Sequence, residues 1–460
     1  MIEGQGKRSI PMCKLALAGA LGFCVAGLFA APPALAGTPD DSPEPSAPAD
    51  QRLALHGQAT STMQSVPGFA APYAGANSLK PNDTQETADV TAYLGARLWR
   101  GAELWANAEI DQGYGLSNTL GVAGFPSGEA YKVSKPNPYF KLPRLFLRQT
   151  IDLGGETSAM EPAANQLARA QSANRLVLTL GKFGVTDIFD ANSYAHDPRG
   201  DFMNWSVIDA GSFDYAANSW GYTFGGAAEW YQGPWTLRLG LFDLSKQPND
   251  TALETNLSQY ELTSELEHRH TIAGHPGVVR LGLWANHGCF LKLADAIAAY
   301  NTNSIMPDPA RLRRQQTRLG GYLNVEQELS ASVGLFARAG LADGSIEAYD
   351  FTDIDRTLSV GAQIKGALWG RADDKIGLAG VVNAISKARQ TYFADGGLGI
   401  LVGDGRLPHP GDEQIIESYY DWQLRKGLNL TGDYQFIANP GYNRDRGPAH
   451  VFALRLHAGF

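Results

Sequence analysis

One long segment of the chain, residues 182–219, gathers side chains that can bind or steer small solutes. Its candidates are Asp187, Asp190, His196, Asp197, Arg199, Asp201 and Trp205. Carboxylates and guanidinium groups offer acceptors and donors to hydroxyl groups, and an indole ring can stack on the apolar face of a sugar ring. The segment is therefore predicted to contact small polar or ionic solutes.

The sequence carries no motif of a known catalyst. It has no Gly-x-Ser-x-Gly elbow, no glycine-rich phosphate loop and no His-Glu-x-x-His pair. His268 and His270 would share one face of a strand, and we interpret them as part of a charged strand end. Asp350, Asp353 and Asp355 lack the spacing and the glycine of a calcium loop, so we interpret them as a solvated outer loop. We predict no enzyme activity, no cofactor and no metal site.

The elements around these residues show strict alternation of apolar and polar positions. In residues 102–111, Ala102, Leu104, Ala106, Ala108 and Ile110 would lie on one face, and Glu103, Trp105, Asn107, Glu109 and Asp111 on the other. A strand has a side-chain period of two, so this segment must separate two environments. Similar alternation recurs in residues 235–241, 279–286, 358–365 and 428–436.

The connections between these segments point to a closed barrel. We predict about sixteen strands of about ten residues each, the length that spans a membrane as a tilted strand. The strands would start near residues 53, 88, 102, 143, 173, 220, 234, 258, 277, 314, 330, 355, 374, 412, 428 and 449. Long connections alternate with tight turns such as Arg100-Gly101 and Lys426-Gly427, with residues 154–173 as the exception. The fold class is therefore all-β: a transmembrane antiparallel barrel with long extracellular loops and short periplasmic turns.

The polar faces would then line the lumen with charges of both signs. The predicted lumen-facing residues include Glu103, Glu109, Asp111, Arg144, Arg148, Arg238, Glu265, Arg280, Arg318 and Arg338. Residues 182–219 form the third long loop, which is predicted to fold into the lumen as a constriction; the alternative is that it only caps the barrel mouth.

The chain divides into three parts. Residues 1–36 read as a signal peptide, with a basic start, an apolar core and Ala34-Leu35-Ala36 before a cleavage site at Gly37. Residues 37–51 read as a flexible periplasmic tail, and residues 52–460 as the barrel. The first part holds one acid and three bases, so cleavage changes the net charge from −9 to −11 and argues against nucleic-acid binding.

Aromatic residues support insertion into an outer membrane. Positions 452, 454, 456, 458 and 460 alternate as apolar residues up to the terminal Phe460, a pattern that the barrel-assembly machinery recognises. A lipid-facing girdle is predicted from Tyr73, Tyr93, Trp99, Trp220, Tyr222, Trp230, Tyr231, Trp235, Tyr419, Tyr420 and Trp422. The expected location is the outer membrane of a Gram-negative bacterium, in contact with its lipid. The sequence leaves homo-oligomer formation open.

Several motifs resemble one known family. They are His56-Gly57-Gln58, Ala71-Pro72-Tyr73, Asn77-Ser78-Leu79, the run from Gly95 to Leu104, and the run from Thr186 through Asp190 and Tyr194-Ala195-His196-Asp197-Pro198-Arg199 to Trp205. From about His56 to Phe460 the chain is similar to the carbohydrate-selective porin family of the OprB type, in a branch also labelled manganese porin. The resemblance implies a sixteen-stranded barrel through which sugars diffuse passively.

Three functions remain at this point. A porin for small sugars is favoured. A porin for small divalent cations such as manganese is the alternative, because a negative lumen concentrates cations. A barrel-borne enzyme such as a lipase is least favoured, because no strand offers a Ser–His pair on its lipid-facing side.

Overall fold

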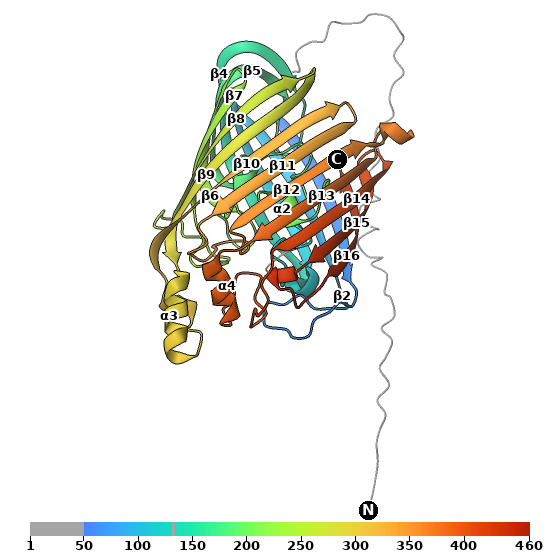
Figure 1. Cartoon of the computed structure of the whole chain (residues 1–460). Helices are drawn as coiled ribbons and strands as arrows, with labels where there is room; N and C mark the ends of the chain where they lie inside the picture. Colours follow the sequence, from blue (N-terminus) through green and yellow to red (C-terminus); the bar gives the residue numbers. More distant parts are fainter. Residues whose placement is uncertain (1–49, 131–133) are drawn as a thin grey trace, which may run out of the picture. The chain divides into compact units, whose positions relative to one another are not determined.

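The computed structural model describes residues 50–130 and 134–460, which form one closed barrel of sixteen antiparallel strands. Each strand pairs with its neighbours in sequence, and β1 (Leu53–Val66) closes on β16 (Ala449–Gly459) (Figure 1). The predicted all-β barrel is confirmed. The expected signal peptide and nearly all of the expected tail lie outside the described residues.

The remaining strands follow in chain order around the barrel. They are β2 (Asp83–Trp99), β3 (Ala102–Gly113), β4 (Lys135–Met160), β5 (Arg169–Phe183), β6 (Thr223–Gln232), β7 (Trp235–Asp243), β8 (Tyr260–Ile272), β9 (His275–Phe290), β10 (Arg314–Ser330), β11 (Val333–Ala342), β12 (Arg356–Lys365), β13 (Lys375–Ala384), β14 (Glu413–Arg425) and β15 (Leu428–Ala438). The helices are α2 (Trp205–Ile208), α3 (Leu293–Asn303) and α4 (Lys387–Ala394). No helix among the described residues is long and apolar enough to cross a membrane.

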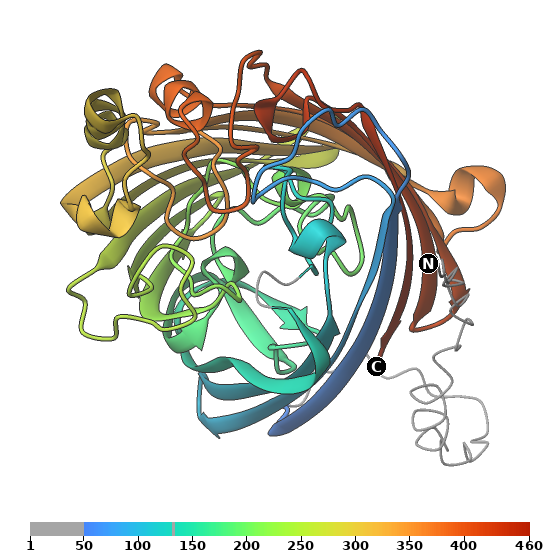
Figure 2. The same cartoon turned by 90° about the horizontal axis from the view of Figure 1, so that it is seen from below.

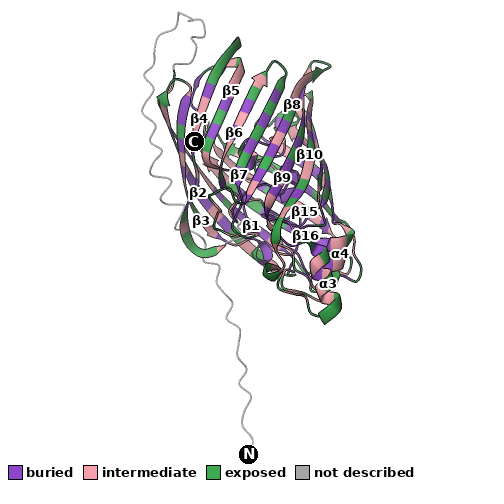
Figure 3. Cartoon of the chain, turned by 90° about the vertical axis from the view of Figure 1, so that its left-hand side faces the viewer, coloured by how far each residue is buried: buried purple, intermediate pink, exposed green. Residues whose placement is uncertain are grey.

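Alternation along each strand separates the two faces of the wall. In β3, Glu103, Trp105 and Asn107 are buried on the inner face, while Leu104 and Ile110 are exposed on the outer face. Figure 3 shows buried and exposed bands alternating along the strands. An exposed leucine on the outer wall of such a barrel is a lipid-facing residue, so the period of two produces an apolar outside and a polar inside.

The two ends of the barrel differ in the length of their connections. At one end, here called the short-turn end, β2–β3, β6–β7, β8–β9, β10–β11 and β14–β15 are joined by two residues each. Gly101 and Gly427 lie in two of these turns at φ of 78° and 74°, a left-handed conformation that favours glycine. The other end, the long-loop end, carries the long connections, including residues 184–222, called loop 3 below.

Three strands are longer than predicted. β2 begins at Asp83 and β4 at Lys135, because both strands continue beyond the barrel wall at the long-loop end. Residues 154–173 were predicted to be a loop, which is wrong: β4 runs to Met160 and β5 starts at Arg169, and these two residues pair. The segment is mostly strand, and most of it is exposed on both faces. Its sequence therefore does not alternate between apolar and polar residues.

Two predictions about side-chain environment are also wrong. Asp350, Asp353 and Asp355 are buried, not solvated, because Arg389 of α4 reaches two of them; its Nη1 lies 2.5 Å from Asp353 Oδ1 and its Nη2 3.0 Å from Asp355 Oδ1. In the girdle, Trp99, Trp230, Trp235, Tyr420 and Trp422 are exposed on the wall. Tyr93 and Tyr419 instead belong to the buried apolar cluster inside the barrel.

Candidate pore constriction

Loop 3 folds into the barrel and is buried along most of its length. Phe189, Phe202 and Val207 are fully buried there and belong to the main apolar cluster. Figure 2 looks into the barrel from the long-loop end and shows green segments of this part of the chain inside the ring of strands. The predicted inward fold, rather than a cap on the mouth, is what the structure shows.

Charged side chains on the inner wall hold loop 3 in place. Arg338 of β11 places its Nε 3.0 Å from Asp190 Oδ1, and both side chains have no solvent-exposed surface. The same guanidinium donates to the carbonyl oxygens of Asp190, Ala195 and Val207 at 3.1, 2.8 and 2.7 Å. A buried cation of this kind is tolerated only when it is paired and fully hydrogen-bonded, which is the case here.

Other wall residues anchor the loop in the same way. Arg318 Nη1 lies 2.5 Å from Asp214 Oδ2, and Arg455 Nη1 donates to the Asp201 carbonyl at 2.9 Å. Glu417 accepts the backbone N–H of Met203 at 2.5 Å. Loop 3 is therefore fixed to several strands, including β10, β11, β14 and β16.

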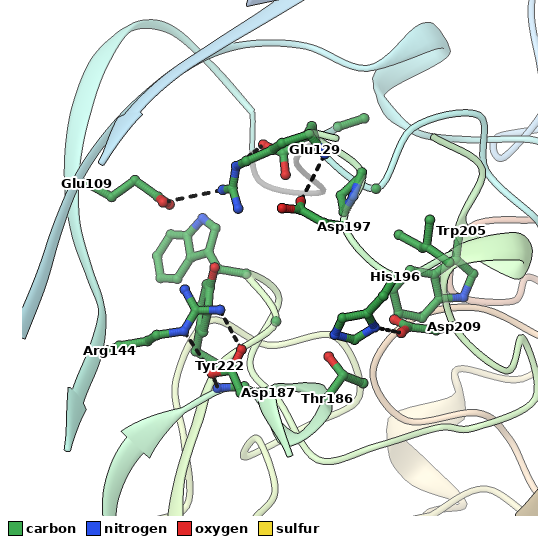
Figure 4. Close-up of a pocket in the computed structure, with 18 of the residues that line it drawn as sticks. Glu109, Glu129, Arg144, Thr186, Asp187, His196, Asp197, Trp205, Asp209 and Tyr222 are labelled. Carbon is green, nitrogen blue, oxygen red and sulfur yellow. Dashed lines mark hydrogen bonds and ion pairs between the residues drawn. The ribbon is translucent and has the colours of Figure 1, made fainter. Parts of the chain in front are cut away.

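Beside loop 3 the lumen keeps a cavity of about 350 Å³. One side is the wall of β1 to β4, and the other is loop 3 together with residues of the second long loop. Its charged lining residues are Glu109, Glu129, Lys141, Arg144, Asp187, His196, Asp197, Arg199 and Asp209. Figure 4 shows the labelled side chains arranged around this space. Five carboxyl groups face three permanent cations and one histidine, so the lining is mixed in sign.

Arg199 is the centre of a charge cluster at the cavity. Its Nε lies 3.3 Å from Glu129 Oε2 and 3.6 Å from Asp89 Oδ1, and its Nη2 lies 3.6 Å from Glu109 Oε2. Its backbone N–H donates to Asp197 Oδ1 at 2.9 Å. Burial raises the pKa of the Glu129 carboxyl well above its ordinary value, although Arg199 opposes that shift. The cluster joins loop 3 to β2, β3 and the second long loop.

A second pair bridges wall and loop on the same side of the cavity. Arg144 of β4 forms a bidentate pair with Asp187, with Nε–Oδ2 and Nη2–Oδ1 distances of 2.7 and 2.6 Å. Its guanidinium carbon lies 5.0 Å from the centre of the Tyr222 ring. Fork geometry fixes the guanidinium plane, so the position of this charge at the cavity is defined.

His196 and Trp205 form the facing side in Figure 4. His196 Nδ1 lies 3.6 Å from Asp209 Oδ1. Burial lowers the pKa of His196, but the nearby Asp209 carboxylate raises it more, so the pKa ends above its ordinary value. Trp205 is held by ring stacking, with centroids 5.1 Å from Phe125 and 4.6 Å from Phe351.

Comparisons with known proteins identify the family. Residues 76–460 match the carbohydrate-selective porin family called the OprB family. The chain belongs to this family. It is a carbohydrate porin, and family and fold indicate a channel rather than an enzyme.

Among solved structures, OprB of Pseudomonas putida at high pH has 15% identity and a TM-score of 0.68, covering 89% of this chain and 94% of the other. The low-pH structure of the same protein has 12% identity and a TM-score of 0.48, with coverage of 89% and 93%. The outer membrane channel DcaP of Acinetobacter baumannii has 10% identity and a TM-score of 0.47, with coverage of 89% and 97%. No curated protein matches the chain. At these identities the likeness shows the fold alone.

The porin's predicted site residues fall into two groups. Of the loop 3 candidates, Asp187, His196, Asp197, Arg199 and Trp205 line the cavity. Asp190 and Asp201 do not; Asp190 pairs with Arg338, and Asp201 Oδ1 lies 3.3 Å from Lys375 Nζ. Of the wall candidates, Glu109 and Arg144 line the cavity, and the others lie outside its lining: Glu103, Asp111, Arg148, Arg238, Glu265, Arg280, Arg318 and Arg338.

Several of these wall residues form an ion network of their own. Arg238 Nη1 lies 2.6 Å from Glu265 Oε1 and 3.0 Å from Glu267 Oε2, and Arg280 Nε lies 2.9 Å from the same Glu267 oxygen. Tyr322 donates to Glu265 Oε2 at 2.7 Å. The network is buried on the inner face, under loop 3, because Glu265 also accepts the backbone N–H of Asp190.

Sequence reasoning missed Lys141 and Glu129. Lys141 Nζ lies 3.2 Å from Glu109 and 2.8 Å from Asp111, so Lys141 faces the inside of the barrel, as Arg144 does. In a regular strand, residues three positions apart would lie on opposite faces. A register shift opposite Asn107 and Glu109 makes the shared orientation possible, because a bulge reverses the alternation. Pro143 between the two basic residues is a sequence signal for such an irregularity. No comparable signal marks Glu129.

Proposed function

We propose that small sugars move down their concentration gradient through the cavity beside loop 3, and that this cavity is the constriction that selects them. The observation that carries the proposal is the combination of paired charges and aromatic rings around one cavity inside the barrel. Sugars present hydroxyl donors and acceptors around apolar ring faces, and this lining offers partners for both. Because most of the lining charges are already paired with each other, a neutral solute meets few unpaired ions.

No finding supports the divalent-cation alternative. Among residues 50–130 and 134–460, no group of three or more His, Cys, Asp or Glu side chains could hold a metal ion. The acidic side chains nearest the passage are engaged by Arg144, Lys141 and Arg199. A mixed lining of this kind favours polar neutral solutes over cations.

We also propose how the protein reaches its membrane. Residues 1–36 would be a signal peptide removed before Gly37, and the last strand would be the signal for the barrel-assembly machinery. Phe452, Leu454 and Leu456 of β16 are exposed on the outer wall, and Phe460 follows at the end of the chain. This apolar row supports the role of the last strand as the assembly signal, because its side chains are exposed on β16, the strand that closes the barrel against β1.

The proposal is tested by swelling of liposomes that contain the purified porin. A monosaccharide should enter faster than a disaccharide at equal osmolarity. Arg144→Gln breaks the bidentate pair with Asp187 inside the passage and should change the ratio of the two rates. Arg100→Gln is the matched control, because Arg100 is highly exposed in a turn at the short-turn end and its loss changes the net charge equally.

Two outcomes would contradict the proposal. One is a swelling rate in monosaccharide equal to that of liposomes without protein. The other is an identical rate ratio for wild type, Arg144→Gln and Arg100→Gln, which would place the selective constriction elsewhere in the barrel.

A further inference from the structure

The hairpin of β4 and β5 is unlike the other hairpins at the short-turn end. Its strands stay paired to Met160 and Arg169, well past the barrel wall, and residues 152–159 are exposed. Figure 1 shows this hairpin rising above its neighbours and bending over at that end of the barrel. Five other connections at the same end need only two residues, so the extra length is not required to turn the chain.

The hairpin has a built-in bend. The pairing register shifts between Asp152 and Gly154 and again between Gly154 and Thr157. Gly154 and Gly155 have φ of 93° and 90°, a conformation that residues with a Cβ rarely adopt. Bulges of this kind redirect a strand, and here they carry the end of the hairpin back toward the barrel.

The end of the hairpin is a compact turn, residues 163–166, called the hairpin tip below. Ala163 and Gln166 exchange backbone hydrogen bonds of 3.1 and 3.0 Å, with Asn165 at φ 58° between them. The next residue, Leu167, has no exposed surface and belongs to the same buried apolar cluster as Tyr93 and Trp105 of the inner wall. Leu167 thus holds the tip against the barrel interior, while Ala163 and Ala164 of the tip itself are exposed.

A set of hydrogen bonds locks the tip to the barrel. Arg148 Nη1 donates to the Asn165 carbonyl at 2.7 Å. Ala168 donates its N–H to Gln51 Oε1 at 2.9 Å, and its carbonyl accepts from the Gln51 N–H at 3.1 Å and from Arg97 Nη2 at 3.1 Å. Arg97 Nε also donates to the Gln51 carbonyl at 2.9 Å. The chain just before β1 thus clamps the hairpin.

The locked tip reaches the passage itself. Ala164 and Asn165 line the same cavity as Arg144, His196 and Arg199, and Ala164 is exposed. We propose that the hairpin tip is a second constriction of this passage, entering from the end opposite loop 3 and limiting the size of the solute that leaves the barrel. The inference rests on the proposed function, because it takes the cavity beside loop 3 as the route of the solute.

Cysteine modification in planar bilayers tests the tip directly. In a Cys289→Ser background, which removes the one described cysteine, Ala164→Cys places a thiol at the tip. A cationic methanethiosulfonate reagent is added, and its attachment is verified by mass. Conductance should fall by roughly half, because the adduct occupies a narrow passage and adds a fixed charge. A reducing agent should restore the conductance.

Ser158→Cys is the matched control. Ser158 lies on the same hairpin, but on its exposed stem, so the same adduct there should leave conductance unchanged. A fall in the Ala164→Cys channel alone supports the second constriction. No fall in a fully modified Ala164→Cys channel overturns it, as does an equal fall in both variants.

A second variant measures size selection and separates the two proposals. Joining β4 and β5 directly at Gly154-Gly155 removes residues 156–173 with the tip, and the disaccharide swelling rate should approach the monosaccharide rate. If the hairpin variants have no effect while Arg144→Gln still changes the rate ratio, only the second constriction fails. If neither has an effect, the cavity is not the route and the proposed function fails.

Discussion

Removing Arg338 should release loop 3 without unfolding the barrel. Arg338→Met keeps much of the side-chain length and removes the charge. The substitution leaves the Asp190 carboxylate without its cation and three carbonyl oxygens without a donor. Breaking a buried ion pair by removing one partner costs about 3–5 kcal/mol, and about 4 kcal/mol is roughly a thousandfold in an equilibrium constant.

That free energy falls on the docking of loop 3, because the sixteen-strand ladder does not depend on this side chain. The anchors at Arg318, Glu417 and Arg455 remain, so the loop should open in part, near residues 190–207. We expect single-channel recordings to show higher conductance with frequent fluctuations. The barrel itself should stay folded. In gel electrophoresis the unheated variant should therefore still run as a folded barrel and should change its mobility only after heating.

A double variant separates anchoring from a general loss of stability. Arg338→Met with Asp190→Asn removes both charges, so the cost should be smaller than the sum of the two single substitutions. Steady conductance at the wild-type value in Arg338→Met would refute the anchoring role. So would a double variant that fluctuates as much as the two single variants added together.

Two further predictions concern the charges of loop 3. Asp197 lines the cavity, and burial raises the pKa of its carboxyl less than Arg199 lowers it, so the side chain is ionised. Asp197→Asn should therefore lower the cation-to-anion permeability ratio roughly twofold. Asp201→Asn, the same change outside the cavity lining, should leave that ratio unchanged in the same bilayer measurement. Asp209 raises the pKa of His196 above 6.5. Protonated His196 therefore stabilises the fold at pH values below 6.5, and this stabilisation is lost as the pH rises through the raised pKa. Lowering the pH through that pKa adds a positive charge and should weaken cation preference, and His196→Gln should abolish this step.

Much of the barrel follows from local pattern. Strand starts at 53, 102, 314, 428 and 449 were predicted to the residue, because alternation and two-residue turns are encoded within a few neighbours. The hairpin of β4 and β5 was missed because its strands leave the wall, and a strand with water on both faces has no reason to alternate. Apolar–polar alternation thus depends on a strand having one face in lipid and the other inside the barrel, and not only on the presence of a strand.

The partners inside the barrel could not be predicted in the same way. The sequence predicts Asp353 and Asp355 to be solvated, because acidic residues in a loop usually are. In the structure they contact Arg389, which comes from another loop more than thirty positions away. Arg338 and Asp190 are 148 positions apart. Alternation places each of these side chains inside the barrel, but the choice of partner depends on how the loops fold over one another.

The arginines of the inner wall and loop 3 divide into two roles according to exposure. Arg318 and Arg338 have no exposed side-chain surface, and each binds a loop 3 carboxylate that is equally buried. Arg144 and Arg199 keep 15% and 14% of their side-chain surface exposed, and both line the cavity. A charge sealed from water can only hold structure, since its hydrogen bonds are all committed, whereas a partly exposed pair can exchange a bond with a passing hydroxyl group. The same residue type thus anchors loop 3 where the loop covers it, and under the proposed function it contacts the solute where loop 3 leaves a gap.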